Sequence, residues 1–267
     1  MIRESIVSGQ FYPNTKEELE KFIKAVTPKE TSKISAKAII LPHAGYIYSG
    51  RVTVTTVNKI LAKKRVVILG NNHTGLGAEF GLWKQGSWLT PLGKVDIDSN
   101  LAELILKNEG CIKADTSSHI HEHSIEVQLP ILKYFFGNFK IVPITCAMAT
   151  LRKYQEAAKQ ICSAIKESRK EVLLVATTDL THYEPDQTAR TKDRAAIEAI
   201  VNLDEQDLIK KVKSLNITMC GLAPVMTLIL CMKELGAKKS QVSLYQTSAE
   251  ESGDFNSVVG YVGMIIN

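Results

Sequence analysis

The chain has 267 residues, of which 45% are hydrophobic and 23% are charged, a balance typical of a soluble globular protein. Its net charge of +5 comes from scattered lysines and arginines, with the longest basic run at 63–65, so we expect no nucleic-acid partner. No apolar window approaches the ~20 residues that span a bilayer, and the N-terminus lacks the apolar core of a signal peptide. We therefore expect no membrane partner and a cytoplasmic location.

The first helix of the chain is predicted from a capping box. Thr15 stands at the N-cap, Glu18 follows three residues later, and Pro28 closes the helical pattern. Further along, helical periodicity or an apolar run with a helix-start signal predicts helices at 50–63, 98–106, 151–168, two across 187–214, and 221–235. The second half of 117–135 is also predicted to be helical, with Pro130 as a kink.

Short apolar runs between these helices predict buried strands at 38–41, 66–70, 141–144, 172–176, 242–245 and 258–262. Residues 78–97 predict an antiparallel excursion with a turn near 91–93. Strand and helix alternate without a linker rich in Pro, Gly or Ser. The sequence therefore predicts one α/β domain over residues 1–267, with a mainly parallel, mixed central sheet flanked by helices.

Chemically active side chains follow three of the predicted strands. His43 follows the strand that Pro42 ends, His73 follows the strand at 66–70, and Asp179 and His182 follow the strand at 172–176. In open α/β sheets, ligands bind at the carboxyl ends of the strands, so we expect these side chains to converge on one edge. The alternative for each histidine is a polar cap on the next helix.

Two imidazoles with one anionic ligand are a common donor set for a divalent metal with open positions. His43 and His73 are the predicted imidazole ligands. The anion can come from Cys220, which precedes Gly221 at a predicted helix start, where free amides favour a thiolate. Cys220 is therefore expected to be the most reactive cysteine near neutral pH, unless it is an inert buried thiol. Asp179 can instead supply the anion, or orient His182.

The other cysteines are predicted to be small core residues. The five cysteines show no CxxC pair, and their odd number argues against a disulfide framework. Four of them lie within or beside apolar segments: Cys111, Cys146, Cys162 and Cys231.

A histidine-rich stretch at 117–126 offers further candidates. HxH spacing can chelate zinc, but the stretch is not HExxH, because position 125 is Ile. His123 and Glu126 lie three residues apart and share a face if the segment is helical, so one of them can point into the site. We expect His119 and His121 to lie at the surface.

These motifs together resemble the Memo family (mediator of ErbB2-driven cell motility). The resemblance runs from near residue 3 to the end, and its most specific motifs are HAGY at 43–46 and EHSIE at 122–126. It implies a fold similar to the B subunit of class III extradiol ring-cleavage dioxygenases, which are non-haem iron enzymes. It also implies a metal pocket whose ligands are His43, His73 and Cys220. For microbial members it implies AMMECR-type and radical SAM proteins as partners, and for animal members phosphotyrosine peptides.

The same resemblance places His123, Asp179 and His182 in the pocket, and we predict these three as the catalytic residues. One departure is that the dioxygenases have a carboxylate where this chain has Cys220; the softer thiolate favours copper(I), zinc or altered iron chemistry over ring cleavage. The first function class is then a copper- or iron-dependent oxidoreductase, with His182 as acid/base held by Asp179.

The second function class is a non-enzymatic module that binds a peptide, a partner protein or an unknown small molecule in the same cleft. A weaker third is a zinc hydrolase, in which the metal activates water.

Overall fold

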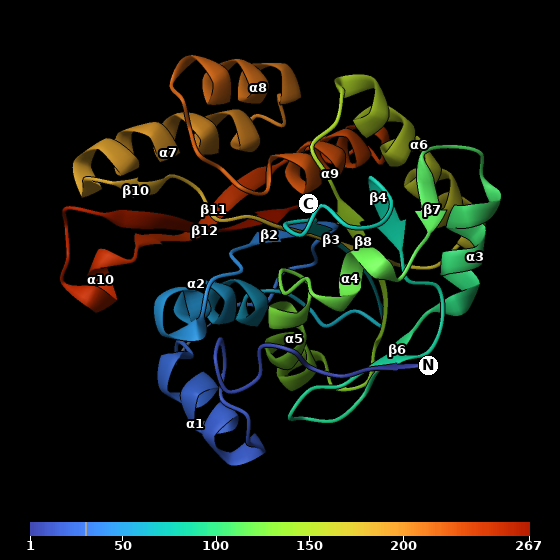
Figure 1. Cartoon of the computed structure of the whole chain (residues 1–267), viewed down its shortest axis with the longest axis horizontal. Coiled ribbons are helices and arrows are strands. Elements are labelled where there is room, and N and C mark those ends of the chain that lie inside the picture. The colour runs from blue at the N-terminus through green and yellow to red at the C-terminus, as the bar shows by residue number, and fades with distance from the viewer. Residues whose placement is uncertain (30) are drawn as a thin grey trace.

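A mixed sheet of twelve strands forms the centre of the protein in the computed structural model, which describes residues 1–29 and 31–267 (Figure 1). Its middle consists of five neighbouring parallel strands: β6 (Val95–Ile97), β8 (Lys140–Cys146), β3 (Arg65–Asn71), β9 (Leu173–Thr177) and β2 (Ala38–Leu41). These parallel strands provide the common edge that was predicted from the sequence.

Antiparallel strands extend the sheet on both sides. Beyond β2, β12 (Val258–Ile266) pairs with β11 (Ser240–Thr247) and β10 (His182–Glu184). Beyond β6 lie β5 (Ser87–Trp88) and β1 (Ile2–Arg3), and β4 (Phe80–Leu82) joins β8 to β7 (Ile112–Ala114). The predicted α/β fold with a mixed central sheet is confirmed.

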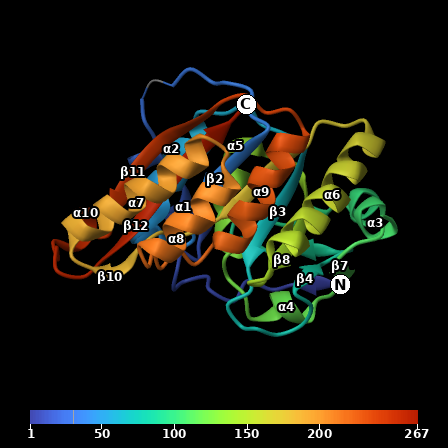
Figure 2. The ribbon, with the colours of Figure 1, turned by 90° about the horizontal axis from the view of Figure 1, so that it is seen from above.

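Helices cover both faces of the sheet (Figure 2). One face carries α3 (Ser99–Lys107), α6 (Leu151–Ser168), α7 (Asp186–Val201), α8 (Glu205–Ser214) and α9 (Leu222–Glu234). The other carries α1 (Lys16–Val26), α2 (Tyr46–Asn58) and α5 (Leu129–Phe136). The short elements are α4 (Ser117–Ile120), the 3₁₀ turn η1 (Glu126–Gln128) and α10 (Ala249–Ser252). Among the described residues, none of the helices combines the length and apolarity that a bilayer crossing requires.

Two predicted helix features are wrong in detail. The helix predicted to start at 50 begins at Tyr46 and ends at Asn58, and Gly50 lies inside it. A Cβ on Gly50 would lie 2.6 Å from the Phe22 ring of α1, so this glycine permits close helix packing rather than a helix start. Pro130 lies in the first turn of α5, where its missing N–H has no intrahelical partner to lose, so it causes no kink.

A buried ion pair ties the N-terminal segment to the 119–126 segment. Arg3 Nη1 lies 2.6 Å from Glu126 Oε2, and both side chains are almost fully buried. Glu126 also accepts hydrogen bonds from the backbone of Ile6 and Val7 and from the Tyr12 hydroxyl, at 2.8–3.1 Å. Arg3 in turn donates to the backbone oxygens of residues 119 and 122. The N-terminus therefore supports the segment that contains the EHSIE motif.

We predict that Glu126→Ala lowers the free energy of unfolding by about 3–5 kcal/mol, because Arg3 would stay buried without its counter-charge. Equilibrium denaturation with urea measures the change. Glu103→Ala, at an exposed position of α3, is the control and should change stability by less than about 0.5 kcal/mol. A loss below about 1 kcal/mol for Glu126→Ala would contradict a buried role for the pair.

Candidate metal centre

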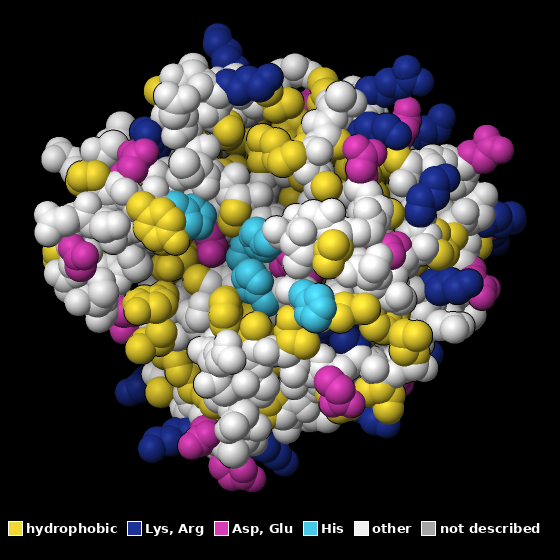
Figure 3. Space-filling model, viewed as in Figure 1, with side chains coloured by type: hydrophobic (Ala, Val, Ile, Leu, Met, Phe, Trp, Pro, Cys, Tyr) yellow, Lys and Arg dark blue, Asp and Glu magenta, His cyan; other side chains and the backbone are white. Residues whose placement is uncertain are grey.

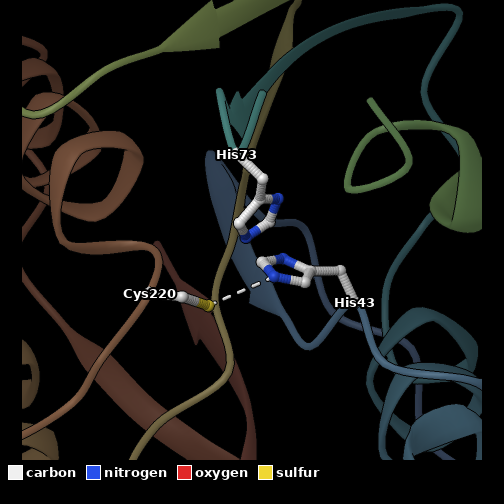
Figure 4. A group of neighbouring side chains, drawn as sticks. All are labelled: His43, His73 and Cys220. Atoms are coloured by element: carbon white, nitrogen blue, oxygen red, sulfur yellow. Dashed lines mark hydrogen bonds between the residues drawn. The ribbon is translucent and has the colours of Figure 1, made fainter. Parts of the chain in front are cut away.

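Histidine side chains gather near the middle of one face of the molecule, in a hollow bordered by hydrophobic side chains (Figure 3). His43 follows β2, His73 follows β3, and Cys220 precedes Gly221, the N-cap of α9. The His43 and His73 ring centroids lie 5.2 Å apart, and Cys220 Sγ lies 3.2 Å from His43 Nε2 (Figure 4). The ligand atoms of these three residues all lie within 4.8 Å of one another. The predicted convergence on one edge of the sheet is therefore found.

His43 is held in place by residues at the end of the neighbouring strand β9. Its Nδ1 contacts the Thr177 hydroxyl at 3.0 Å, and its backbone N–H donates to Asp179 Oδ1 at 2.9 Å. Burial lowers the pKa of His43 well below the ordinary value, and the neighbouring histidines lower it further. The imidazole is therefore neutral at pH 7, with Nε2 directed at Cys220, which is the form that ligates a metal.

His73 is oriented by Glu122, a residue for which the sequence predicted no role. Glu122 accepts from His73 Nδ1 at 2.9 Å and from the His73 backbone N–H at 2.7 Å. Burial opposes ionisation of Glu122, but hydrogen bonds from His73 and Ser124 outweigh it and lower its pKa to about 2. A carboxylate on Nδ1 leaves Nε2 as the nitrogen that could ligate a metal. The feature of the sequence that could have indicated this role is the position of Glu122 directly before His123 in the EHSIE motif.

Asn71, the last residue of β3, provides an independent test of whether the cleft suits a ligand. Its amide Nδ2 lies 2.9 Å from His73 Nε2, and its Oδ1 is buried without a hydrogen-bond partner among the described residues. Asn71, His73 and Cys220 line a cleft of about 490 Å³. An orphaned amide oxygen beside two imidazoles and a thiol fits a site built to hold a metal and a further polar ligand.

Asp179, His182 and Cys220 form a second group whose ligand atoms lie within 4.8 Å of one another. The predicted hydrogen bond from Asp179 to His182 is wrong. His182 Nδ1 instead donates to the backbone oxygens of Leu180 and Thr218, at 2.7 and 3.0 Å. Asp179 accepts instead from the His43 backbone N–H. Because both carbonyls accept from Nδ1, they fix the tautomer in which Nδ1 carries the proton and Nε2 the lone pair.

His123 lies beside His73 at the candidate site, and His119 does not. The His123 ring stacks on His73, with centroids 5.0 Å apart, and lies 4.8 Å from the Phe11 ring. The prediction of a surface position is confirmed for His121 and is wrong for His119, which is fully buried. The short helix α4 turns His119 inwards, where Nε2 contacts the Gly81 oxygen at 2.8 Å and the ring packs edge-on against Trp83 and Trp88.

Cys220 is partly exposed, whereas the other four cysteines are buried as predicted. Burial and the adjacent Asp179 carboxylate raise the pKa of the Cys220 thiol to about 12, so the expected activation by the helix start is wrong. The reason is that the Gly221 N–H, at the start of α9, donates to the Thr178 hydroxyl and not to the sulfur. A bound cation would replace the thiol proton, as metal ligation does for coordinating thiols.

Comparisons with known proteins agree over nearly the whole chain. A family model described as Memo-like protein matches residues 3–265. A MEMO1 family protein of Methanopyrus kandleri is 40% identical over 99% of both chains. Another, from Aquifex aeolicus, is 41% identical over 99% of this chain and 98% of its own. An uncharacterized Escherichia coli K12 protein shares the fold, with a TM-score of 0.52 at 12% identity, covering 85% of this chain and 98% of that one.

We predict that His119 makes the fold sensitive to acid. Burial lowers its pKa to about 4, so between pH 6.5 and about 4 the unfolded chain binds a proton that the folded protein does not. Stability should therefore fall as the pH falls through this window. His119→Gln should reduce that loss by about 2–3 kcal/mol at pH 4.5, measured by urea unfolding at pH 7 and 4.5. His121→Gln is the exposed control, and an unchanged pH dependence in His119→Gln would contradict the assignment.

We also predict that Cys220 is alkylated slowly at pH 7 in chelator-treated protein, with a rate that still rises about tenfold per pH unit at pH 9. Asp179→Asn should increase the rate, because it removes the negative charge that raises the thiol pKa. Peptide mass spectrometry after timed iodoacetamide labelling measures each cysteine. Glu103→Gln serves as a distant charge control. A rate that levels off below pH 8 would show that the thiolate is already present.

Proposed function

The chain belongs to the Memo family, and from that premise we propose that it is a metal-dependent oxidoreductase whose metal is held by His43, His73 and Cys220. One observation carries the proposal. The three donor atoms lie within reach of one ion, while the second nitrogen of each histidine is engaged by the protein, through Thr177 and Glu122. Such second contacts are typical of histidines that ligate metals.

The donor set favours copper or iron. Two imidazoles and a thiolate are the equatorial ligands of blue-copper sites, and a thiolate selects soft or borderline metals over Mg²⁺ or Ca²⁺. A copper or iron ion would supply one-electron redox chemistry at this position. Zinc fits the same donors but is redox-inert, and it would support hydrolysis instead. Three protein ligands leave further positions towards the cleft of about 490 Å³.

The remaining cleft residues would position and exchange protons. His182 presents Nε2 to the site with its tautomer fixed by two carbonyls, and its partial exposure allows exchange with solvent. It is therefore the proposed general acid/base. Burial lowers the pKa of His123, which favours the neutral form of the ring that stacks on His73. Asp179 holds the His43 backbone and adds negative charge beside the cation site.

A second candidate function is the binding of a peptide or small molecule without turnover. A hollow of about 360 Å³ adjoins the centre through Phe11, whose ring contacts His123. Its walls include Phe22 and Tyr46, and Ile47 at its rim is 66% exposed. This surface favours an apolar or aromatic group of the ligand.

We predict that substitutions of the metal ligands and their supports weaken metal binding, whereas substitution of the proposed acid/base lowers turnover alone. His43→Ala should bind copper(I) at least about 100-fold more weakly, and Glu122→Gln about 10–100-fold more weakly. His182→Ala should keep metal affinity but lose about 10²–10⁴-fold in metal-dependent oxidation by dioxygen. Competition with a chelating dye measures affinity, and oxygen uptake measures turnover.

His121→Ala, at an exposed position outside the cleft, is the matched control and should change neither quantity. If copper- or iron-loaded wild-type protein turns over no faster than free metal, the oxidoreductase proposal fails and the binding function remains.

A further inference from the structure

A separate hollow, distinct from the two near the metal centre, lies at the opposite end of the parallel strands. It has a volume of about 450 Å³ and forms where β6, β8 and β3 begin. Because β3 contains seven residues, its start lies about 20 Å from the end that leads to His73. The two sites are therefore separated by the length of the central sheet.

Basic side chains from several separate segments line this hollow. Strand register places Lys140 beside Arg65 on one side and beside Asp96 on the other, so these three side chains share one face of the sheet. The other basic residues come from the turns before β3 and β6 and from the last turn of α5. The complete lining is Lys64, Arg65, Lys94, Asp96, Lys133, Asn138, Phe139 and Lys140.

The protein neutralises little of this charge. Five cations and one carboxylate line the hollow, a balance of 5 − 1 = +4. Arg65 is paired with Asp98 at 2.7 Å. Among the residues that the structure describes, Lys64 and Lys133 donate only to uncharged oxygens of Asn138, at 3.4 and 3.3 Å. Within residues 1–29 and 31–267, neither Lys94 nor Lys140 has a carboxylate within 4 Å of its ammonium group.

Many lysines elsewhere on the molecule have an acidic partner. Three bridges between separate elements illustrate this: Lys63 with Glu171, Lys166 with Glu234, and Lys211 with Glu198. In the hollow, by contrast, five cationic side chains line one concave surface with a single carboxylate. Repulsion between like charges on one surface raises the free energy unless an anion is bound. A ligand with several negative charges would remove that repulsion.

We propose that this hollow binds an oligophosphate group, either as a free chain or as part of a nucleotide. Lysine is a common phosphate ligand, because its ammonium is a compact point charge with three donors. The five cations come from several separate segments, so linked phosphates can contact more of them than a single phosphate can. The volume lies within the usual range for small-molecule sites, about 300–1,000 Å³.

Calorimetric titration of the chelator-treated protein with sodium tripolyphosphate, at low salt and without Mg²⁺, tests the proposal. We expect one ligand per chain and an affinity that weakens as salt is added. The double variant Lys94→Gln/Lys140→Gln should bind at least tenfold more weakly. Lys113→Gln/Lys159→Gln makes the same charge change at exposed positions outside the hollow and should bind within twofold of wild type.

The remaining comparisons identify the source of the phosphates and the place of binding. Equal affinity for tripolyphosphate and ATP would support recognition of the chain alone, and tighter binding of ATP would support a nucleotide. Orthophosphate binding as tightly as tripolyphosphate would indicate an adventitious ion only and would overturn the proposal. Equal weakening in both double variants would indicate a net-charge effect and would overturn the proposal as well. Loss of binding in His43→Ala would indicate binding at the metal centre, with the same consequence.

Discussion

The buried carboxylate of Glu122 is the contact on which the geometry of the metal centre depends. It accepts hydrogen bonds from the ring and backbone of His73 and from the Ser124 backbone, so it joins the end of β3 to the EHSIE segment. Four residues later, Glu126 joins the same segment to Arg3 and the N-terminus. The two glutamates of the motif therefore act as braces. Loss of either would free a histidine or its support rather than remove a donor atom directly.

The charges of the site favour a cation. Burial raises the pKa of Asp179, and burial together with Asp179 raises that of Cys220, so burial opposes the ionisation of both groups. A bound cation stabilises both anions at once, and its binding releases protons. The affinity for a metal would therefore be coupled to pH through the thiol. Among the described residues, the site also contains a buried polar atom without a hydrogen-bond partner, Asn71 Oδ1, which is an energetic cost in the folded protein.

Local patterns were sufficient to predict the longer strands and most of the helices, but not the short strands β1, β7 and β10. They also predicted that His43 and His73 converge, because parallel strands place the residues at their carboxyl ends along one edge, and that Cys220 joins them from a helix start. Three of the failures, at Gly50, His119 and His182, share one cause, which is dependence on residues distant in sequence. Gly50 lies inside a helix, where the absence of a side chain lets the Phe22 ring of another helix pack closely. His119 is buried beside Trp83 and Trp88, and His182 is oriented by the Thr218 oxygen. Sequence spacing cannot report such tertiary partners.

The three histidines at the strand ends differ in the group that contacts Nδ1, and this difference orders their roles. His73 faces a carboxylate, His43 a hydroxyl, and His182 two backbone carbonyls. A carboxylate on Nδ1 makes Nε2 more basic, so His73 would be the strongest donor to a bound metal of the three. The carbonyls polarise His182 less and fix only its tautomer, which suits a ring that exchanges a proton at Nε2. Chemically identical side chains therefore differ in basicity and tautomer through their second contacts, and this difference matches the roles proposed for them.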